Sequence, residues 1–155
     1  CTRVGAGPFP TELFDDVGKK IASNGNEFGS TTGRARRCGW LDIPALKYSI
    51  MLNGVTELYM MKADVLSDFN EIKVCIGYNY NGEKIDYFPS SIESENISPI
   101  YKTFQGWTSK SNKAKKFEDL EKNFQSYVRF IEDQVGVKIN LISLGPVREQ
   151  TIYIN

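Results

Sequence analysis

The chain has 155 residues, of which 41% are hydrophobic and 25% charged, a composition typical of a globular domain and not of a disordered segment. Nineteen basic residues balance nineteen acidic ones, so no overall field would attract nucleic acid or an anionic membrane. Histidine is absent, which removes the commonest general acid or base near neutral pH and the commonest metal ligand.

The apolar runs and the cysteines indicate where the protein would be found in the cell. Neither a long apolar run nor a signal peptide is visible, so we expect a soluble protein. Cys1, Cys38 and Cys75 match neither a disulfide framework nor a zinc site, which favours a reducing cytoplasm. The chain opens on Cys1-Thr2-Arg3-Val4 without a methionine, and we expect it to be the later portion of a longer chain.

Two helices are predicted in the first third. Gly5 to Pro10 forms a turn, and Thr11 stands where an N-cap belongs, ahead of apolar residues at fourfold spacing over residues 11 to 23. Asp42 can cap a second helix that Asn53-Gly54 would end.

Strand patterns follow. Glu57 to Lys62 is a short apolar run, and Glu71 to Tyr80 alternates apolar with polar residues. Asn81-Gly82 is a hairpin signal that would pair the second strand with Lys84 to Phe88. Residues 90 to 115 are polar and predict mostly surface connection, with a possible strand at Ile100 to Phe104.

The last third predicts the longest helix and two more strands. Apolar residues recur at helical spacing from Phe117 to Val135, and Gly136 would cap the C-terminus. Lys138 to Leu144 and Gln150 to Ile154 resemble strands. Together these elements predict an α/β fold: a mixed sheet with flanking helices and an antiparallel hairpin. No repeat or linker interrupts residues 1–155, so we expect a single unit.

An anion-binding loop is the main candidate site. Residues Gly29 to Arg37 join glycines and hydroxyl side chains to three arginines. Glycine lets backbone N–H groups face a ligand, and guanidinium groups fit carboxylate or phosphate in bidentate fashion. A solvated basic turn is the plain alternative, but such a turn has no need of the glycine and threonine residues ahead of the arginines.

A second candidate site lies where strands end. Lys62 and Asp64 follow one apolar run, and Ser143-Leu144-Gly145-Pro146 closes another. Ligands bind at this edge in α/β folds, and one carboxylate can accept both N1–H and N2–H of guanine. The alternatives are an ion pair at a strand end and an ordinary turn.

Three other features favour structural roles. Neighbouring residues on a helix point in different directions, so Asp15 and Asp16 indicate a surface role and not a catalytic pair. Lys113 to Lys116 could contact RNA, but more simply solvates the start of the long helix. Trp40 and Trp107 belong to no stacking series, which favours packing in the core or at its rim.

Dense blocks of sequence resemble adenylosuccinate synthetase. They are Gly5 to Leu13, Gly25 to Arg34, Arg36 to Asp42, Lys62 to Leu66 and Ser143 to Pro146. The resemblance covers essentially the whole chain and corresponds to roughly the last third of the enzyme. It implies a GTP-dependent ligase that condenses IMP with L-aspartate to adenylosuccinate, releasing GDP and phosphate, in AMP biosynthesis and purine salvage.

The resemblance also implies roles for individual residues. The aspartate-binding residues would be Gly29, Ser30, Thr31, Thr32, Gly33, Arg34 and Ala35, with Arg34 also reaching IMP. The GTP-binding residues would be Arg36, Lys62, Ala63, Asp64, Ser143, Leu144 and Gly145. Ala35, Met61 and Ala63 depart from residues that many relatives carry there.

The phosphate loop, the magnesium-binding aspartate and the catalytic histidine of the family have no counterpart in this sequence. The resemblance therefore implies that Mg²⁺ binds through an absent front portion, that this segment supplies no catalytic or metal-binding residue, and that it is inactive alone. It further implies a cytoplasmic homodimer without nucleic-acid or membrane partners. A noncatalytic nucleotide- or RNA-binding module is the alternative, and a purely structural domain is the third reading.

Overall fold

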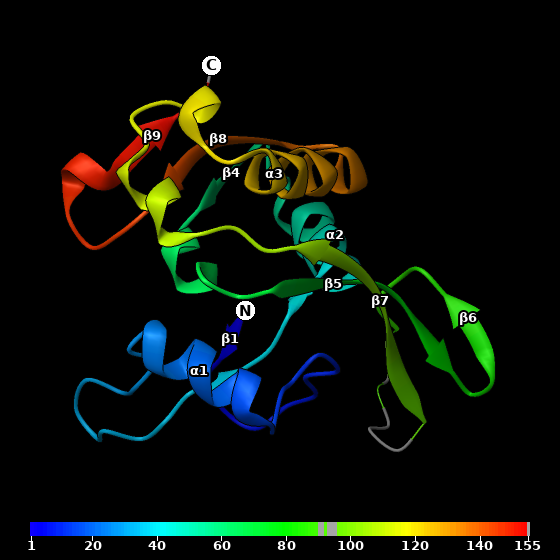
Figure 1. The fold of residues 1–155 in the computed structure, drawn as a ribbon. Coiled ribbons are helices and arrows are strands. Elements are labelled where there is room, and N and C mark those ends of the chain that lie inside the picture. Colours follow the sequence, from blue (N-terminus) through cyan, green and yellow to red (C-terminus); the bar gives the residue numbers. More distant parts are fainter. Residues whose placement is uncertain (90–91, 93–95, 155) are drawn as a thin grey trace. The chain divides into compact units, whose positions relative to one another are not determined.

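The computed structural model describes residues 1–89, 92 and 96–154, and Figure 1 labels its elements. The Cα positions divide the chain into two compact units, Cys1–Tyr48 with Lys73–Lys102 and Ser49–Ile72 with Thr103–Asn155. Parallel and antiparallel strand pairs occur together with helices, which confirms the predicted α/β class with a mixed sheet. Within the described residues, no helix is both long and apolar enough to cross a membrane.

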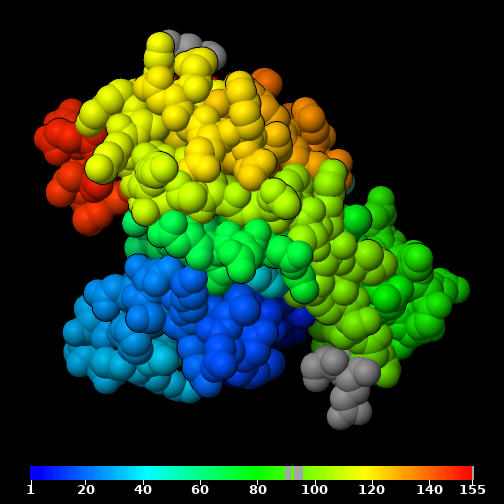
Figure 2. All heavy atoms as spheres, viewed as in Figure 1, coloured from blue at the N-terminus to red at the C-terminus, as the bar shows by residue number. Residues whose placement is uncertain are grey.

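The first unit begins with a minimal sheet. Strand β1 (Thr2–Arg3) pairs antiparallel with β2 (Arg37–Cys38), so that Arg3 lies opposite Arg37. Figure 2 shows the blue to cyan atoms of residues 1 to 40 gathered in one body. The start of the chain therefore lies directly against the end of the arginine-rich loop.

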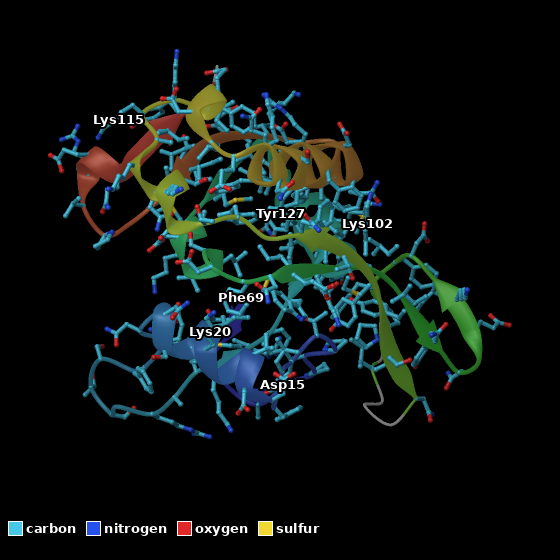
Figure 3. The ribbon with its side chains drawn as sticks, viewed as in Figure 1. Asp15, Lys20, Phe69, Lys102, Lys115 and Tyr127 are labelled. Atoms are coloured by element: carbon cyan, nitrogen blue, oxygen red, sulfur yellow. The ribbon has the colours of Figure 1, made fainter. Side chains whose placement is uncertain are left out.

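Helix α1 (Asp16–Asn24) starts later than the sequence predicted. The side chain of Asp15 accepts a 3.0 Å hydrogen bond from Gly18 N and is the N-cap (Figure 3). The predicted N-cap, Thr11, is wrong because its hydroxyl donates to the carbonyl of Trp40 at 2.9 Å. The hydroxyl that the local pattern assigned to the helix is therefore used in a contact with Trp40, which is distant in sequence.

The main sheet of the first unit is built around β5 (Glu71–Tyr80). Strand β3 (Leu41–Asp42) pairs with it in parallel, β6 (Glu83–Ile85) pairs antiparallel, and β7 (Ile97–Gln105) also pairs with it. The possible strand predicted at Ile100 to Phe104 is confirmed as part of β7, which is longer than predicted at both ends. Residues 90–91 and 93–95 of the predicted surface connection lie outside the described residues.

Two local signals are confirmed in this unit. Tyr80 pairs with Glu83 across a turn in which Asn81 and Gly82 have φ of 50° and 85°, both left-handed, as a two-residue hairpin requires. Asp42 caps helix α2 (Ile43–Asn53) by accepting a 3.0 Å hydrogen bond from the backbone N–H of the helix's third residue.

The second unit contains a sheet in the order β4, β8, β9. Strands β4 (Glu57–Met60) and β8 (Lys138–Ser143) are parallel, whereas β8 and β9 (Thr151–Tyr153) are antiparallel. All three were predicted, with ends that differ by one or two residues. Because β4 and β8 run in the same direction, the loops that follow them emerge at one edge of the sheet.

Helix α3 (Lys122–Val135) is the longest in the described residues and ends at Gly136, whose φ of 70° confirms the predicted cap. Its start was predicted too early, because Phe117 belongs to a separate 3₁₀ turn. Trp107 is 2% exposed and stacks on Phe124 with ring centroids 4.1 Å apart, which confirms a packing role. Short 3₁₀ helices also occur at Ala63–Leu66, Ser109–Lys113 and Arg148–Gln150.

Candidate functional site

The loop after α1 is a tight turn closed by its own backbone. Phe28 and Ala35 form an antiparallel bridge. Inside it, Gly29 N donates to Arg34 O at 2.9 Å, and Gly33 N donates to Gly29 O at 2.8 Å. Gly33 has a φ of 64°, in the region that favours glycine. The two glycines therefore make the turn possible, one by conformation and the other by close approach.

The tip of this loop presents unused donors. In the part of the chain that the structure describes, the backbone N–H groups of Ser30, Thr31 and Thr32 have no hydrogen-bond acceptor. A cavity of about 350 Å³ opens beside them. Its lining consists of Arg3, Val4, Gly5, Gly29, Ser30, Thr31, Thr32, Arg34, Ala35, Arg36 and Arg37. Such a row of N–H groups suits an anionic oxygen.

The three arginines of the loop have different surroundings. Arg36 Nη1 lies 3.0 Å from Oε2 of Glu27, whose side chain is 7% exposed. Arg37 donates to the carboxylate of Glu12, and this hydrogen bond raises the pKa of the guanidinium. Arg34 is exposed, and its guanidinium has no partner among the described residues. Arg34 is thus the cation that remains open to a ligand.

The sequence did not reveal the two carboxylates that pair with Arg36 and Arg37. Glu27 lies nine residues before Arg36, and Glu12 lies 25 residues before Arg37. It also missed Val4 as part of the cavity wall. An excess of positive charge in a compact loop is a signal that partners must exist, but it does not say which acidic residues they are.

The second candidate site lies within the other unit, at the carboxyl edge of β4 and β8. Met60 and Ile142 are register partners near the ends of these strands. After β4, Lys62 has a φ of 55°, Ala63 is buried, and Oδ1 of Asp64 is buried without a hydrogen-bond partner among the described residues. A buried acceptor without a donor is costly, so this oxygen is suited to a ligand that brings one.

The segment after β8 lies at the same edge. The hydroxyl of Ser143 donates to Gly145 O at 3.0 Å, and Leu144 N donates to Gln150 O at 2.8 Å. A Cβ at Gly145 would lie 2.2 Å from Oε1 of Gln150, so a side chain there would require the Gln150 side chain to move. The structure therefore brings Lys62, Ala63 and Asp64 to the same sheet edge as this turn.

Neither candidate site resembles a metal centre. Across residues 1–89, 92 and 96–154, no group of three or more cysteine, aspartate or glutamate side chains could hold a metal ion. Glu12 and Glu27, the carboxylates beside the loop, are already paired with arginine. The side chains that the structure describes therefore do not fit Mg²⁺.

The model of the adenylosuccinate synthetase family matches residues 1–152. The chain belongs to the adenylosuccinate synthetase family. Synthetases of Bacteroides fragilis and Phocaeicola vulgatus are 56% identical to it over 152 residues, which are 98% of this chain and 36% of each relative.

Structural similarity agrees. The fully ligated adenylosuccinate synthetase of Plasmodium falciparum superposes with a TM-score of 0.94 at 38% identity, covering 100% of this chain and 38% of that one. This confirms the fold predicted from the resemblance. The chain spans about a third of the length of the synthetases that it matches.

Proposed function

We propose that this chain is the C-terminal part of a longer adenylosuccinate synthetase that joins IMP to L-aspartate with GTP, in de novo AMP biosynthesis and purine salvage. Family membership and a match to only 36% of each relative support this proposal. In the proposed reaction, GTP phosphorylates the purine 6-oxygen. The aspartate amine then displaces that phosphate from carbon 6, and GDP and phosphate are released.

The loop at residues 29–35 would bind L-aspartate. The observation that carries this assignment is the unpartnered guanidinium of Arg34 beside the free N–H groups of Ser30, Thr31 and Thr32. A dicarboxylate needs a cation and several neutral donors, and the cavity supplies both kinds of group. Arg34 would also reach IMP, and Arg36 would lie close to GTP.

The edge of β4 and β8 would bind guanine. Asp64 would accept N1–H and N2–H of the base, which would satisfy its buried Oδ1. Lys62 and Ala63 precede it, and the turn at Ser143, Leu144 and Gly145 would line the same pocket.

The remaining machinery would lie outside this chain. The described carboxylates fit no magnesium site, so we assign the Mg²⁺ site and the catalytic groups to the rest of the polypeptide. We propose a cytoplasmic homodimer, and we expect residues 1–155 alone to be inactive. Adenylosuccinate formation by the isolated chain would contradict that part.

The test is an aspartate titration of the complete protein, with adenylosuccinate formation followed at saturating IMP and GTP. Arg34→Leu should raise the KM for aspartate or lower kcat/KM roughly tenfold to a hundredfold, as expected for loss of a charge-assisted hydrogen bond. Lys84→Leu, which removes an exposed cation from β6, is the control and should have no effect. An unchanged aspartate response in Arg34→Leu would rule out the assigned role.

A further inference from the structure

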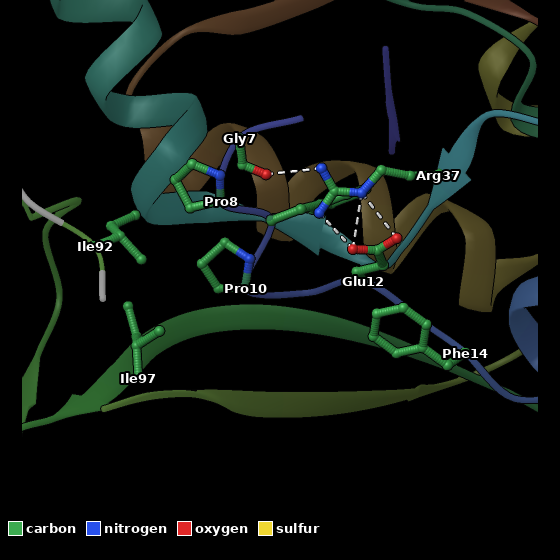
Figure 4. Close-up of a pocket in the computed structure, with 9 residues that line it drawn as sticks. Gly7, Pro8, Pro10, Glu12, Phe14, Arg37, Ile92 and Ile97 are labelled. Atoms are coloured by element: carbon green, nitrogen blue, oxygen red, sulfur yellow. Dashed lines mark hydrogen bonds and ion pairs between the residues drawn. The ribbon is translucent and has the colours of Figure 1, made fainter. Parts of the chain in front are cut away.

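The guanidinium of Arg37 joins three separate groups, two of which, the Glu12 carboxylate and the Gly7 carbonyl, are drawn in Figure 4. Its Nε donates to both carboxylate oxygens of Glu12 at 2.9 Å, and Nη2 donates to one of them. Its Nη1 donates to the carbonyls of Gly5 and Gly7 at 3.1 and 2.7 Å. All three nitrogens are therefore engaged within the protein, in a geometry that only a planar fork can provide.

Glu12 is itself fixed by backbone contacts. It forms an antiparallel bridge with Gly39, and its N–H donates to Phe9 O at 3.0 Å. Its side chain is 12% exposed, and the ring of Phe9 lies 5.6 Å from the Arg37 guanidinium carbon. The carboxylate is a rigid anchor, so the arginine fork has one defined position.

The carbonyls that Arg37 binds belong to a segment with little other support. Strand β1 has two residues, and in the described part of the chain the carbonyls from Val4 to Pro8 accept hydrogen bonds from Arg37 alone. Gly5 has a φ of 94°, in the left-handed region that favours glycine, and a Cβ there would meet nothing within 4 Å. Without Arg37, the carbonyls of Gly5 and Gly7 would lose the donor that holds them.

That segment forms one wall of the 350 Å³ cavity. Val4 and Gly5 contribute one part of its lining, and the loop from Gly29 to Thr32 contributes another. Arg37 belongs to β2, which continues directly from that loop, and its side chain reaches back to the Gly5 carbonyl. The Glu12–Arg37 pair thus joins the two walls.

We propose that Arg37, oriented by Glu12, is a positioning residue that sets the distance between the Val4–Gly5 wall and the aspartate loop. It acts through Gly5 and the loop and need not touch substrate, because its nitrogens are already used. This inference rests on the proposed function of the cavity. A buried ion pair that merely stabilises the fold is the competing explanation, and steady-state kinetics separate the two.

The experiment measures kcat and the KM values for aspartate, IMP and GTP in the complete enzyme carrying Arg37→Leu, Arg37→Lys or Glu12→Gln. Arg37→Leu should raise the KM for aspartate or IMP roughly tenfold to a hundredfold, the scale of a displacement of about 1 Å in a binding group. Lysine keeps the charge but loses the fork, so Arg37→Lys should recover only part of this loss. The KM for GTP should stay near the wild-type value.

Arg129→Leu is the matched control, because it removes an arginine that pairs with the buried carboxylate of Glu132 on α3 and is not among the residues that line the cavity. It should lower stability without changing the KM for aspartate. If Arg37→Leu does not fold, Arg37→Lys and Glu12→Gln carry the test.

Unchanged KM values for aspartate and IMP in the folded variants, with losses confined to kcat, would overturn the inference. Arg34→Leu, measured in parallel, separates this failure from failure of the proposed function. If Arg34→Leu raises the KM for aspartate and the Arg37 and Glu12 variants do not, only the positioning role fails. If none of them changes it, the cavity is not the aspartate site.

Discussion

Arg36 Nη1 lies 3.0 Å from Oε2 of Glu27, and this carboxylate is almost fully buried. Two residues earlier in the same loop, Arg34 is exposed and has no partner in the described part of the chain. The two arginines therefore have separable roles. One neutralises a charge that folding has removed from water, and the other is available to a ligand.

This difference predicts unequal effects on stability. Arg36→Leu should lower the free energy of unfolding by about 1–3 kcal/mol, because it removes the guanidinium that lies 3.0 Å from the buried carboxylate of Glu27. Arg34→Leu should change it by less than about 0.5 kcal/mol, as is usual for an exposed side chain. Urea denaturation of the complete protein measures the free energy of unfolding of both variants. Equal decreases would show that the contact between Arg36 and Glu27 adds no stability beyond that of an exposed side chain.

The role proposed for Asp64 leads to a prediction about the preference for GTP over ITP. An asparagine at this position keeps one acceptor but cannot accept N1–H and N2–H together, so Asp64→Asn should reduce the preference for GTP over ITP, which lacks N2. The expected change in the kcat/KM ratio is roughly tenfold to a hundredfold. Asp133→Asn, at an exposed position on α3, is the control. An unaltered ratio in Asp64→Asn would remove Asp64 from the base-binding role.

Asp42 predicts a pH dependence of stability. Burial raises the pKa of its carboxyl above the ordinary 3.8, although hydrogen bonds from the Tyr78 hydroxyl at 2.6 Å and from Ala45 N partly oppose this. The folded state then binds the proton more strongly than the unfolded state, so this group's contribution to stability is present below pH 3.8 and is lost as pH rises through the raised pKa.

Asp42→Asn removes this titration while keeping an oxygen that can accept both hydrogen bonds. Relative to wild type, the free energy of unfolding of Asp42→Asn should therefore increase, meaning a more stable variant, as pH rises from 3.8. Denaturant titrations across this range measure the trend, and exposed Asp86→Asn should show none of it. A difference between Asp42→Asn and wild type that does not vary with pH would contradict the prediction.

We expect the thiol of Cys75 to be inert in the folded protein. It is 0% exposed, and burial, followed by the nearby Asp42 charge, raises its pKa to about 12. Since the thiolate is the nucleophile, iodoacetamide at neutral pH should modify exposed Cys1 and leave Cys75 intact. Mass spectrometry of the native protein checks this, with the denatured protein as the positive control. Equal labelling of the two cysteines in the native state would be inconsistent with the buried site.

Elements with a local cause were predictable from the sequence. The Asn81-Gly82 turn, the Asp42 cap and the Gly136 cap each depend on the conformational freedom or the hydrogen bonds of residues a few positions apart. The start of α1 was not predictable in this way, because the hydroxyl of Thr11 is used by Trp40, 29 residues away.

The sequence by itself determined the α/β class, the family resemblance and the segments that carry the candidate sites, since these depend on residue types at short spacing. Only the tertiary structure decided which arginine is open to a ligand. Arg34, Arg36 and Arg37 are chemically identical, and their roles separate because folding brings Glu27 and Glu12 to two of them and to the third no carboxylate that the structure describes. An ion pair depends on distance in space, which spacing along the chain does not specify.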